Sequence, residues 1–262
     1  MSEMLCLNHI CVSYGSRQIL HGIDLSLQPG EFCALLGLNG SGKSTLLHGL
    51  CGFLPMAGQV QVNGIDCTRM HEKKRAQLLS FLPQTPSLAG GRTTLDAVLM
   101  GYNAQLGLFD SPSAAQCQNA LAILGRFGLA DQADVDFGTL SQGQKQLVLL
   151  ARSMVQEAPV MLMDEPDSAL DLANRSHMAA LLAEFVHASG KTALICLHDP
   201  MLMLDWCDTL IVLQNGQVGA MLYPRTDPVE ALQSALAAVY GPLELVPVTD
   251  RTGRVRLALL PL

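Results

Sequence analysis

Short apolar runs separated by turns occupy the first part of the chain. The runs Leu5–Ser13, Gln18–Leu27 and Gln59–Val62 are predicted to form strands of an antiparallel sheet. Glu31–Leu36 is mostly apolar and ends at a glycine, which favours a buried strand of a parallel sheet. The segment Lys43–Cys51, which follows a glycine-rich loop, predicts a helix.

Helical periodicity dominates the middle of the chain. It runs from Thr93 to Phe127 with an interruption at Gly107–Pro112, and it returns in the amphipathic segment Gln144–Gln156. We therefore expect a small helical subdomain separate from the strands.

Buried strands return after this helical part. Val160–Met163 and Thr192–Leu197 are apolar runs of strand length, and Leu210–Val218 predicts a hairpin around Asn215-Gly216, a pair that favours a type I′ turn. Strands and helices that alternate around three apolar runs predict an α/β core with a mainly parallel sheet.

The composition narrows the class of protein. Of 262 residues, 49% are hydrophobic and 15% are charged, and the formal net charge is -7. An acidic chain argues against nucleic-acid binding, which normally needs a basic face, so we expect no nucleic-acid partner. No apolar run approaches the roughly 20 residues that cross a bilayer, and the N-terminus lacks the pattern of a signal peptide. Eight cysteines without a Cys-x-x-Cys pair indicate reduced thiols, so we expect a cytosolic protein.

A glycine-rich loop separates the predicted strand that ends at Leu36 from the helix that begins at Lys43. The loop fits the pattern G-x-x-x-x-G-K-[ST] in the strand–loop–helix context that this pattern requires. Its glycines let backbone amides turn toward phosphates, and the helix N-terminus adds its positive end. We expect Lys43 to reach the β- and γ-phosphates and the Ser44 hydroxyl to ligate Mg²⁺. The candidate nucleotide-binding residues here are Gly37, Leu38, Asn39, Gly40, Ser41, Gly42, Lys43, Ser44 and Thr45.

Two acids follow the apolar run Val160–Met163. Asp164 is suited to hold the magnesium shell. Glu165 is placed to polarise an attacking water as a general base, a role that contributes about 10²–10⁴ in rate. The alternative is a solvated acidic pair at a turn, which is common in α/β proteins. The adjacent glutamate favours hydrolysis over a kinase reaction or a slow GTPase switch.

The motif Leu140-Ser141-Gln142-Gly143-Gln144 directly precedes the predicted amphipathic helix. Ser141 fits an N-cap, and Gln144 fits its partner in a capping box. A capped helix start with a glycine in its first turn is a potential anion site. Taken alone, the motif is better explained as an ordinary helix cap.

The order of these motifs resembles that of the ABC (ATP-binding cassette) ATPases over nearly the whole chain. The further matching elements are Tyr14 at the place of the family's adenine-stacking aromatic, Gln84 in Phe81-Leu82-Pro83-Gln84, Ser168-Ala169-Leu170-Asp171, and His198 after an apolar strand. The resemblance implies an α/β fold: a P-loop NTPase core with a mainly parallel sheet, an N-terminal antiparallel β-subdomain and an inserted helical subdomain.

The resemblance also implies one ABC ATPase domain over residues 1–262. The expected division is residues 1–88 and 157–222 for the nucleotide-binding core with its β-subdomain, 89–156 for the helical subdomain with the signature motif, and 223–262 for a C-terminal extension. No clear family pattern covers this extension. Within it, Asp227–Tyr240 predicts a helix and Arg254–Leu260 a strand.

In this family, two cassettes face head to tail, and each ATP lies between one phosphate loop and the partner's signature. The resemblance therefore implies that the signature acts in trans, with Ser141 and Gly143 at the γ-phosphate bound by a second copy of the chain. The implied signature set is Ser141, Gln142, Gly143 and Gln144.

The resemblance assigns roles to three more residues. Gln84 is implied to sense magnesium and to link to the membrane subunit, and Asp171 to couple the two ATP sites. His198 is implied to clamp the γ-phosphate and to orient Glu165 and the water, although a histidine at a strand end is more often structural. Asp199-Pro200 fits a cap and the first residue of a helix, which places His198 at the carboxyl edge of the sheet. The implied cofactors are ATP and Mg²⁺, and the metal ligands are Ser44, Gln84 and Asp164.

Three residues depart from the family pattern. Gln142 replaces the usual second-position glycine, so we expect crowding near the partner's phosphate. Asp167 stands where threonine is common and adds a negative charge near the catalytic acid, and Lys145 takes a position often held by arginine. We expect altered rate or dimer affinity without loss of activity, because Ser141 and Gly143 are retained.

The segments Thr94–Gly101 and Ser168–Asn174 resemble those of importers of iron–siderophore, haem, cobalamin and related metal chelates. Molybdate importers share these patterns and stay an alternative. The chain carries no fused membrane domain or second cassette, so we expect a homodimer, peripheral at the cytoplasmic face of the inner membrane. Its further partners would be integral-membrane permease subunits and, indirectly, a substrate-binding protein.

A different class of function also stays open. The chain could be a soluble ABC ATPase in cluster assembly or DNA maintenance. A non-hydrolysing regulator is disfavoured by Glu165 and His198.

Overall fold

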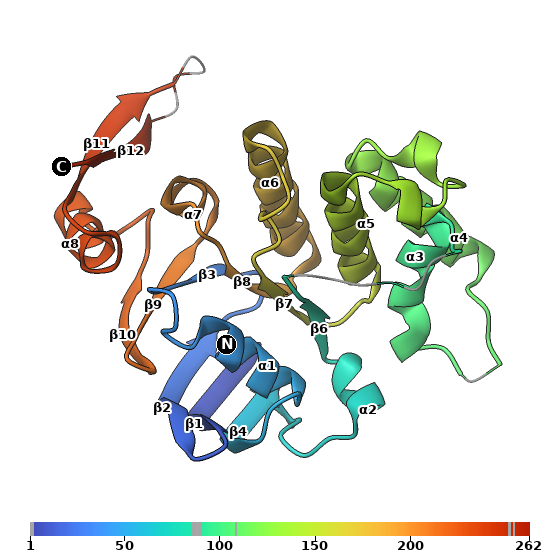
Figure 1. Ribbon diagram of the computed structural model, residues 1–262, viewed down its shortest axis with the longest axis horizontal. Helices are drawn as coiled ribbons and strands as arrows, with labels where there is room; N and C mark the ends of the chain where they lie inside the picture. The colour runs from blue at the N-terminus through green and yellow to red at the C-terminus, as the bar shows by residue number, and fades with distance from the viewer. Residues whose placement is uncertain (1–2, 85–87, 89–90, 108, 251–252, 254) are drawn as a thin grey trace.

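Three β-sheets and the helices around them make up the described part of the chain. The computed structural model describes residues 3–84, 88, 91–107, 109–250, 253 and 255–262. The antiparallel sheet contains four strands in the order β2-β1-β4-β5 (Figure 1). Its strands are β1 (Leu5–Tyr14), β2 (Arg17–Leu27), β4 (Met56–Val62) and β5 (Ile65–Asp66). The predicted antiparallel sheet is therefore confirmed, with the third strand starting earlier than expected.

The central sheet contains six strands in the order β10-β9-β3-β8-β7-β6. Adjacent pairs among its strands are parallel except β10, which pairs antiparallel with β9. Asn215 and Gly216 join these two strands with φ values of 49° and 73°, as a type I′ turn requires. The strands are β3 (Phe32–Leu36), β6 (Leu79–Leu82), β7 (Val160–Asp164), β8 (Thr192–Cys196), β9 (Thr209–Gln214) and β10 (Gln217–Leu222).

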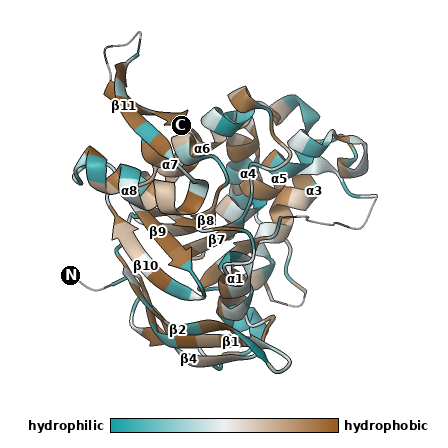
Figure 2. Ribbon diagram, turned by 60° about the vertical axis from the view of Figure 1, so that its left-hand side comes forward, coloured by the Kyte–Doolittle hydropathy of each residue, from teal (hydrophilic) through white to brown (hydrophobic). Residues whose placement is uncertain are grey.

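Three interior strands, β3, β8 and β7, are buried on both faces and divide their side chains between two cores. Every residue of these strands is buried. Side chains alternate between the faces of a strand, so Cys33 and Leu35 pack with the antiparallel sheet and α1 (Lys43–Cys51), while Phe32, Ala34 and Leu36 pack with the helices beyond the other face. Continuous apolar runs are the sequence consequence of this arrangement; Figure 2 shows the hydrophobic colouring of β9.

The helices of the middle segment gather at one side of the molecule (Figure 1). They are α3 (Thr94–Leu99), a 3₁₀ turn (Met100–Ala104), α4 (Ala114–Arg126) and α5 (Gln142–Val155). Capping boxes at Thr93, Ser113 and Ser141 begin the three α-helices. The cap at Ser141 starts α5 two residues earlier than the predicted Gln144. Short 3₁₀ turns follow at Ala130–Gln132 and Phe137–Thr139.

Several elements lay outside the sequence prediction, β5 among them. The edge strand β6 is only four residues long and contains Ser80, whose hydroxyl lies 3.2 Å from that of Ser153. The helix α2 (Glu72–Ala76) is a single charged turn. The helix α6 (Leu172–Ser189) is rich in alanine and shows no clear apolar stripe in sequence. Among the described helices, none is both long and apolar enough to cross a membrane.

The last segment adds one helix and a two-stranded ribbon. These are α8 (Val229–Tyr240), β11 (Leu243–Thr249) and β12 (Val255–Pro261), and the ribbon projects from the body of the molecule (Figure 1). The predicted helix from Asp227 starts two residues later than expected, and β11 was not predicted. The predicted strand at Arg254–Leu260 corresponds to β12, while Arg254 itself lies outside the described residues.

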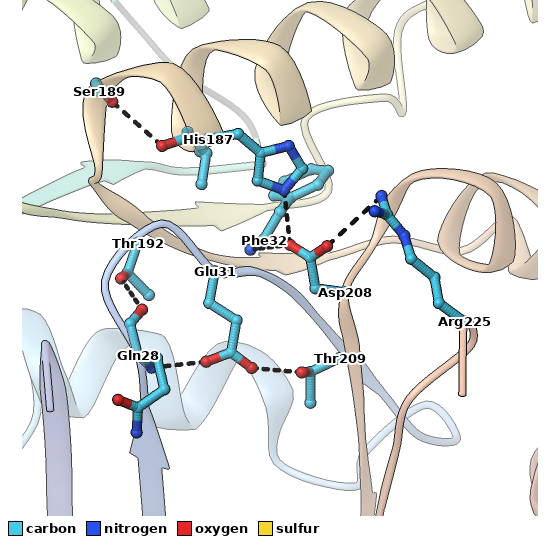
Figure 3. Close-up of polar contacts among 10 residues, drawn as sticks. Gln28, Glu31, Phe32, His187, Ser189, Thr192, Asp208, Thr209 and Arg225 are labelled. Atoms are coloured by element: carbon cyan, nitrogen blue, oxygen red, sulfur yellow. Dashed lines mark hydrogen bonds and ion pairs between the residues drawn. The ribbon is translucent and has the colours of Figure 1, made fainter. Parts of the chain in front are cut away.

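A polar network joins the amino ends of three parallel strands (Figure 3). Asp208 accepts a hydrogen bond from the Phe32 amide at 2.9 Å, and its same oxygen lies 2.8 Å from His187 Nε2 at the end of α6. The neighbouring Glu31 carboxylate accepts a hydrogen bond from the Thr209 hydroxyl. The carboxylates of Asp208 and Glu31 at this edge of the sheet therefore already have hydrogen-bond partners within the protein.

Candidate functional site

The carboxyl ends of four neighbouring strands meet at the opposite edge of the central sheet. β6 leads to Gln84, β7 to Glu165, β8 to His198, and β3 to the loop that begins at Gly37. These strands run parallel, so motifs that lie far apart in sequence converge here.

The phosphate loop wraps around the side chain of Lys43. This lysine is the first residue of α1 and is 8% exposed. Its Nζ donates to the carbonyl oxygens of Gly37 at 2.8 Å and Leu38 at 3.3 Å. The loop needs glycine at two points: a Cβ on Gly37 would lie 2.4 Å from a backbone oxygen, and one on Gly42 would lie 2.6 Å from a side chain of β2. Both positions also have positive φ.

The exposed middle of the loop borders a cavity of about 420 Å³. Leu38, Asn39 and Gly40 are exposed, whereas Ser44 and Thr45 are partly buried in the first turn of α1. The Ser41 Oγ atom is buried without a hydrogen-bond partner among the described residues. A buried hydroxyl without a partner costs roughly 1–3 kcal/mol, so the loop is better satisfied with an added acceptor or donor. The cavity is lined by Leu38, Asn39, Gly40, Ser41, Leu213, Gln214, Asn215, Ala238 and Val239.

The end of β7 places two acids in different environments. Asp164 is 4% exposed, and its Oδ1 has no partner within the described part of the chain. Burial, and after it the negative charge of Asp164, raises the pKa of the neighbouring Cys196 thiol well above its ordinary value, while Lys43 opposes the rise. Glu165 has a φ of 49°, a conformation that costs about 1–3 kcal/mol in a non-glycine residue and clusters at functional sites.

Glu165 lies between two side chains from neighbouring strand ends. Gln84 Nε2 donates to Glu165 Oε2. His198 Nε2 lies 2.5 Å from Glu165 Oε1, with the glutamate side chain 15% exposed and the histidine side chain 51% exposed. The glutamate backbone amide also donates to the carbonyl oxygen of Cys196 at 3.1 Å. The carboxylate is therefore held in one orientation at the open edge of the sheet.

The signature motif lies at the exposed start of α5. Ser141 Oγ accepts from the Gln144 amide at 3.3 Å, and Gln144 Oε1 accepts from the Ser141 amide at 3.0 Å, so the predicted capping box is confirmed. A Cβ on Gly143 would lie 3.2 Å from the Ala169 carbonyl oxygen, which puts the signature against the segment that ends at Asp171. Asp171 in turn caps α6 by accepting from the Asn174 amide at 2.8 Å.

A separate cavity of about 410 Å³ lies beside the signature. It is lined by residues that follow α4, by the signature and α5, and by the start of α6 with the segment before it, including Ser141, Gly143 and Asp171. Among the described residues, none of the phosphate loop lines it. The structure thus brings Gln84, Glu165 and His198 together, whereas the signature lines a different cavity from the phosphate loop.

The three departures from the family pattern have different surroundings. Gln142 is exposed at the first position of α5. Lys145 Nζ donates to the Gly138 carbonyl oxygen at 2.8 Å and lies 6.0 Å from the centre of the Phe137 ring. Asp167 is 1% exposed, and burial raises the pKa of its carboxyl.

The candidate adenine-stacking residue Tyr14 lies at the end of β1 and is 49% exposed. Its neighbour β2 contributes Leu20, which lies against the phosphate loop at Gly42. Sequence reasoning missed the contribution of α8 to the phosphate-loop cavity. No motif in Ala238 or Val239 could have indicated it, because the contact depends on how the last segment folds back.

Comparison with known proteins supplies the family. Residues 20–168 match the family model described as ABC transporter. A probable iron chelatin transport ATP-binding protein of Helicobacter pylori is 30% identical over 93% of this chain and 95% of its own. A hemin import ATP-binding protein of Roseobacter denitrificans is 35% identical over 88% of each chain. A manganese transport ATP-binding protein of Bacillus subtilis also matches, at 34% identity over 81% of this chain and 84% of its own.

Solved structures of similar chains extend the match to the fold. A chain from a transporter described as metal-chelate type, in an inward-facing conformation, superposes with a TM-score of 0.82 at 27% identity and covers 99% of this chain and 98% of its own. A bacterial ABC transporter cassette solved as a dimer has a TM-score of 0.76 at 26% identity and covers 86% of this chain and 100% of its own. Because the first match covers 99% of this chain, it includes nearly all of residues 223–262.

Proposed function

Because this chain belongs to the ABC transporter family, whose members are ATPases, we propose that it powers import of a metal chelate through a separate membrane permease. The ligand class would be an iron–siderophore, haem or cobalamin type of chelate. The observation that carries this choice is the near-complete match, C-terminal extension included, to the metal-chelate type transporter. Relatives named for hemin and iron chelatin transport support the same class.

The first step is binding of ATP at the phosphate loop. The backbone around Gly37–Gly42 and the N-terminus of α1 present amide donors to the phosphates, and Lys43 would exchange its bonds to loop carbonyl oxygens for the β- and γ-phosphates. The buried Ser41 hydroxyl without a partner fits a site completed by a ligand. Tyr14, exposed at the end of β1, would stack on the adenine.

The residues present also fit Mg²⁺. Asp164 keeps one buried oxygen without a partner, and Ser44 and Gln84 offer oxygen atoms, the donors that this hard cation takes. Bound there, Mg²⁺ would supply positive charge against the β- and γ-phosphate oxygens.

Glu165 is the proposed general base of hydrolysis. Its carboxylate would accept a proton from a water molecule while the water oxygen bonds to the γ-phosphorus and the bond to the leaving ADP oxygen breaks. Gln84 and His198 hold the two carboxylate oxygens, so the base is oriented before the water arrives. His198, half exposed, retains surface for contact with the γ-phosphate.

The second half of each site is proposed to come from another copy of the chain. Ser141 and Gln142 of the signature are exposed, the signature and the phosphate loop line different cavities, and a related cassette is solved as a dimer. Ser141 and Gly143 of one copy would then face the γ-phosphate of the other, with Gln142 and Gln144 beside them. Asp171, which caps α6 next to the signature, would transmit the state of one site to the other.

The permease would dock beside Gln84. A cavity of about 380 Å³ there is lined by aromatic and basic side chains, among them Phe53, Phe81 and Arg152. Phe53 is 58% exposed, and burial lowers the pKa of Arg152. An apolar segment of the permease would cover Phe53, and an acidic side chain on that segment would pair with Arg152. The chain would thereby lie peripherally at the cytoplasmic face of the membrane.

The deciding experiment is transport in cells that lack the gene. Uptake of labelled iron–siderophore, haem and cobalamin is compared with uptake of molybdate and manganese. We expect loss of one metal chelate and recovery with the wild-type gene but not with Glu165→Gln. Selective loss of molybdate or manganese uptake would instead support another importer class. Normal uptake of all of them, with soluble assembly factors co-purifying, would support the soluble ATPase.

A further inference from the structure

The C-terminal strap, as we name residues 223–262, is fastened to the helix that follows His198. This helix, α7 (Pro200–Trp206), begins two residues after His198. Asp199, the single residue between them, is its N-cap and accepts from the Met201 amide at 2.8 Å. With only one residue in the connection, a shift of α7 moves the backbone of His198.

The strap holds α7 at its first turn, at its last turn and just beyond. In the first turn, the Leu259 amide of β12 donates to Met201 Sδ at 3.2 Å. In the last turn, Arg256 Nη1 lies 2.7 Å from Asp205 Oδ2. Beyond the helix, Arg225 lies 3.6 Å from Asp208, within the network of Figure 3.

Arg256 is the central fastening. Its Nε also bonds Asp250 Oδ2 at 3.0 Å, so one guanidinium joins the ribbon to α7. The side chains of Asp205 and Arg256 are 13% and 32% exposed. Charge-assisted bonds of this kind, partly shielded from water, hold geometry better than exposed pairs. Asp205 is the main cause of a raised pKa for Arg256, which agrees with a tight pair.

Apolar packing continues the same connection. Leu202 and Met203 of α7 are buried in one core with Leu236 and Val239 of α8 and Leu243 of β11. Val239 also lines the cavity at the phosphate loop. The strap therefore packs against α7, which follows His198, and also borders the phosphate-loop cavity.

The His198 ring is placed by its backbone, since its side chain is 51% exposed yet lies 2.5 Å from Glu165 Oε1. The ring reaches Glu165 from a backbone position that α7 fixes, so a shift of α7 would alter this contact. We infer that Arg256 is a positioning residue for ATP hydrolysis, which through Asp205 and α7 keeps His198 in register with Glu165. This inference rests on the role proposed above for His198.

The test compares ATP hydrolysis by the purified full-length chain and its variants. Arg256→Gln is expected to lower kcat about tenfold, as a small misplacement of a catalytic group does. The KM for ATP is expected to stay within about twofold, because the phosphate loop is untouched. Arg256→Lys keeps the charge toward Asp205 and should recover most of kcat. Arg126→Gln is the matched control, since Arg126 forms an ion pair with Glu184 at 3.0 Å and is similarly exposed at 34%.

Each variant is also melted, and all rates are measured well below the lowest Tm. A wild-type kcat for Arg256→Gln would overturn the inference, as would an equal fall for Arg126→Gln. Failure of Arg256→Lys to recover kcat would also overturn it. Should Arg256→Gln not fold, Asp250→Asn, which loosens the same guanidinium, is expected to give a smaller fall in kcat, and no fall would be decisive against positioning. His198→Ala separates the two levels. A wild-type kcat for His198→Ala would overturn the proposed role of His198 and the inference with it, whereas a fall in kcat for His198→Ala beside a wild-type kcat for Arg256→Gln would overturn the inference alone.

Discussion

The phosphate-loop region and the signature region are both helix N-termini, but they differ in what each leaves unsatisfied. At the phosphate loop, Ser41 Oγ and Asp164 Oδ1 are buried without partners among the described residues, and Lys43 bonds loop carbonyl oxygens. At the signature, Ser141 and Gln144 satisfy one another through a capping box and lie at the surface. The phosphate-loop region has polar atoms that a ligand bound by the same chain would satisfy. The signature region has its own polar atoms satisfied, which suits contact with a ligand bound by another chain.

The largest predicted effect removes chemistry from the first region and leaves binding there. Glu165→Gln keeps the shape of the side chain but removes the base, so turnover should fall by about 10²–10⁴. ATP binding should persist and trap a dimer, as measured by light scattering with and without ATP. Glu184→Gln on exposed α6 is the control. ATPase activity of Glu165→Gln near that of the wild type would exclude Glu165 as the base.

The next effect breaks the second region alone. Gly143→Asp places a negative charge where the γ-phosphate of a second copy is expected, and turnover should fall about a hundredfold, as when a transition-state donor is lost. ATP affinity measured at low protein concentration should not change. Gly125→Asp, at an exposed and uncrowded glycine of α4, should be neutral. Weaker ATP binding by Gly143→Asp in the isolated chain would argue for a site within one chain.

A third effect weakens binding in the first region. Lys43→Ala removes the ammonium that reaches the phosphates, and ATP affinity should fall at least about tenfold. Equilibrium binding of a fluorescent ATP analogue measures this. Lys74→Ala on exposed α2 should bind normally. Equal affinity of Lys43→Ala and the wild type would remove Lys43 from the phosphate site.

The smallest effect concerns a buried acid beside the first region. Burial raises the pKa of Asp167, so the folded chain holds this proton more tightly than the unfolded chain. Stability is therefore lost as pH rises above the ordinary carboxyl range, and Asp167→Asn should gain in Tm over the wild type as pH rises above about 4.

An opposite acid serves as the control for that pH dependence. Hydrogen bonds from Thr68 and Gln59 lower the pKa of exposed Asp66 to about 2, which stabilises the fold above the ordinary carboxyl range. Asp66→Asn should therefore lose Tm relative to the wild type as pH rises. The same pH trend for both variants would contradict the assignment for Asp167.

Local sequence patterns predict much of the fold, and the order of the motifs along the chain predicts the residues of the site. The fully apolar runs of β3, β7 and β8 and the Asn215-Gly216 turn carry strong local signals, because burial on both faces and positive φ restrict residue choice. The sequence signals of strand β6, helix α6 and strand β11 are weak. The sequence placed Glu165 and His198 at strand ends, and the family resemblance implied that Gln84 senses magnesium, but the contacts among these residues depend on sheet order.

Other features depend on long-range packing and could not be predicted. The contacts of the strap with α7 join Arg256 to Asp205, and no local pattern anticipates such a pair. The burial of Asp167 likewise depends on elements distant in sequence. The division of the chain into subdomains and the roles of the site residues stay predictions.

Mixing two inactive variants tests most directly whether ATP is held between two copies. Lys43→Ala keeps an intact signature, and Gly143→Asp keeps an intact phosphate loop. If the halves of a site come from different chains, a mixed dimer contains one complete site, and an equal mixture should recover up to about a quarter of wild-type ATPase activity. Activity no greater than the average of the two variants measured alone would contradict a site shared between chains.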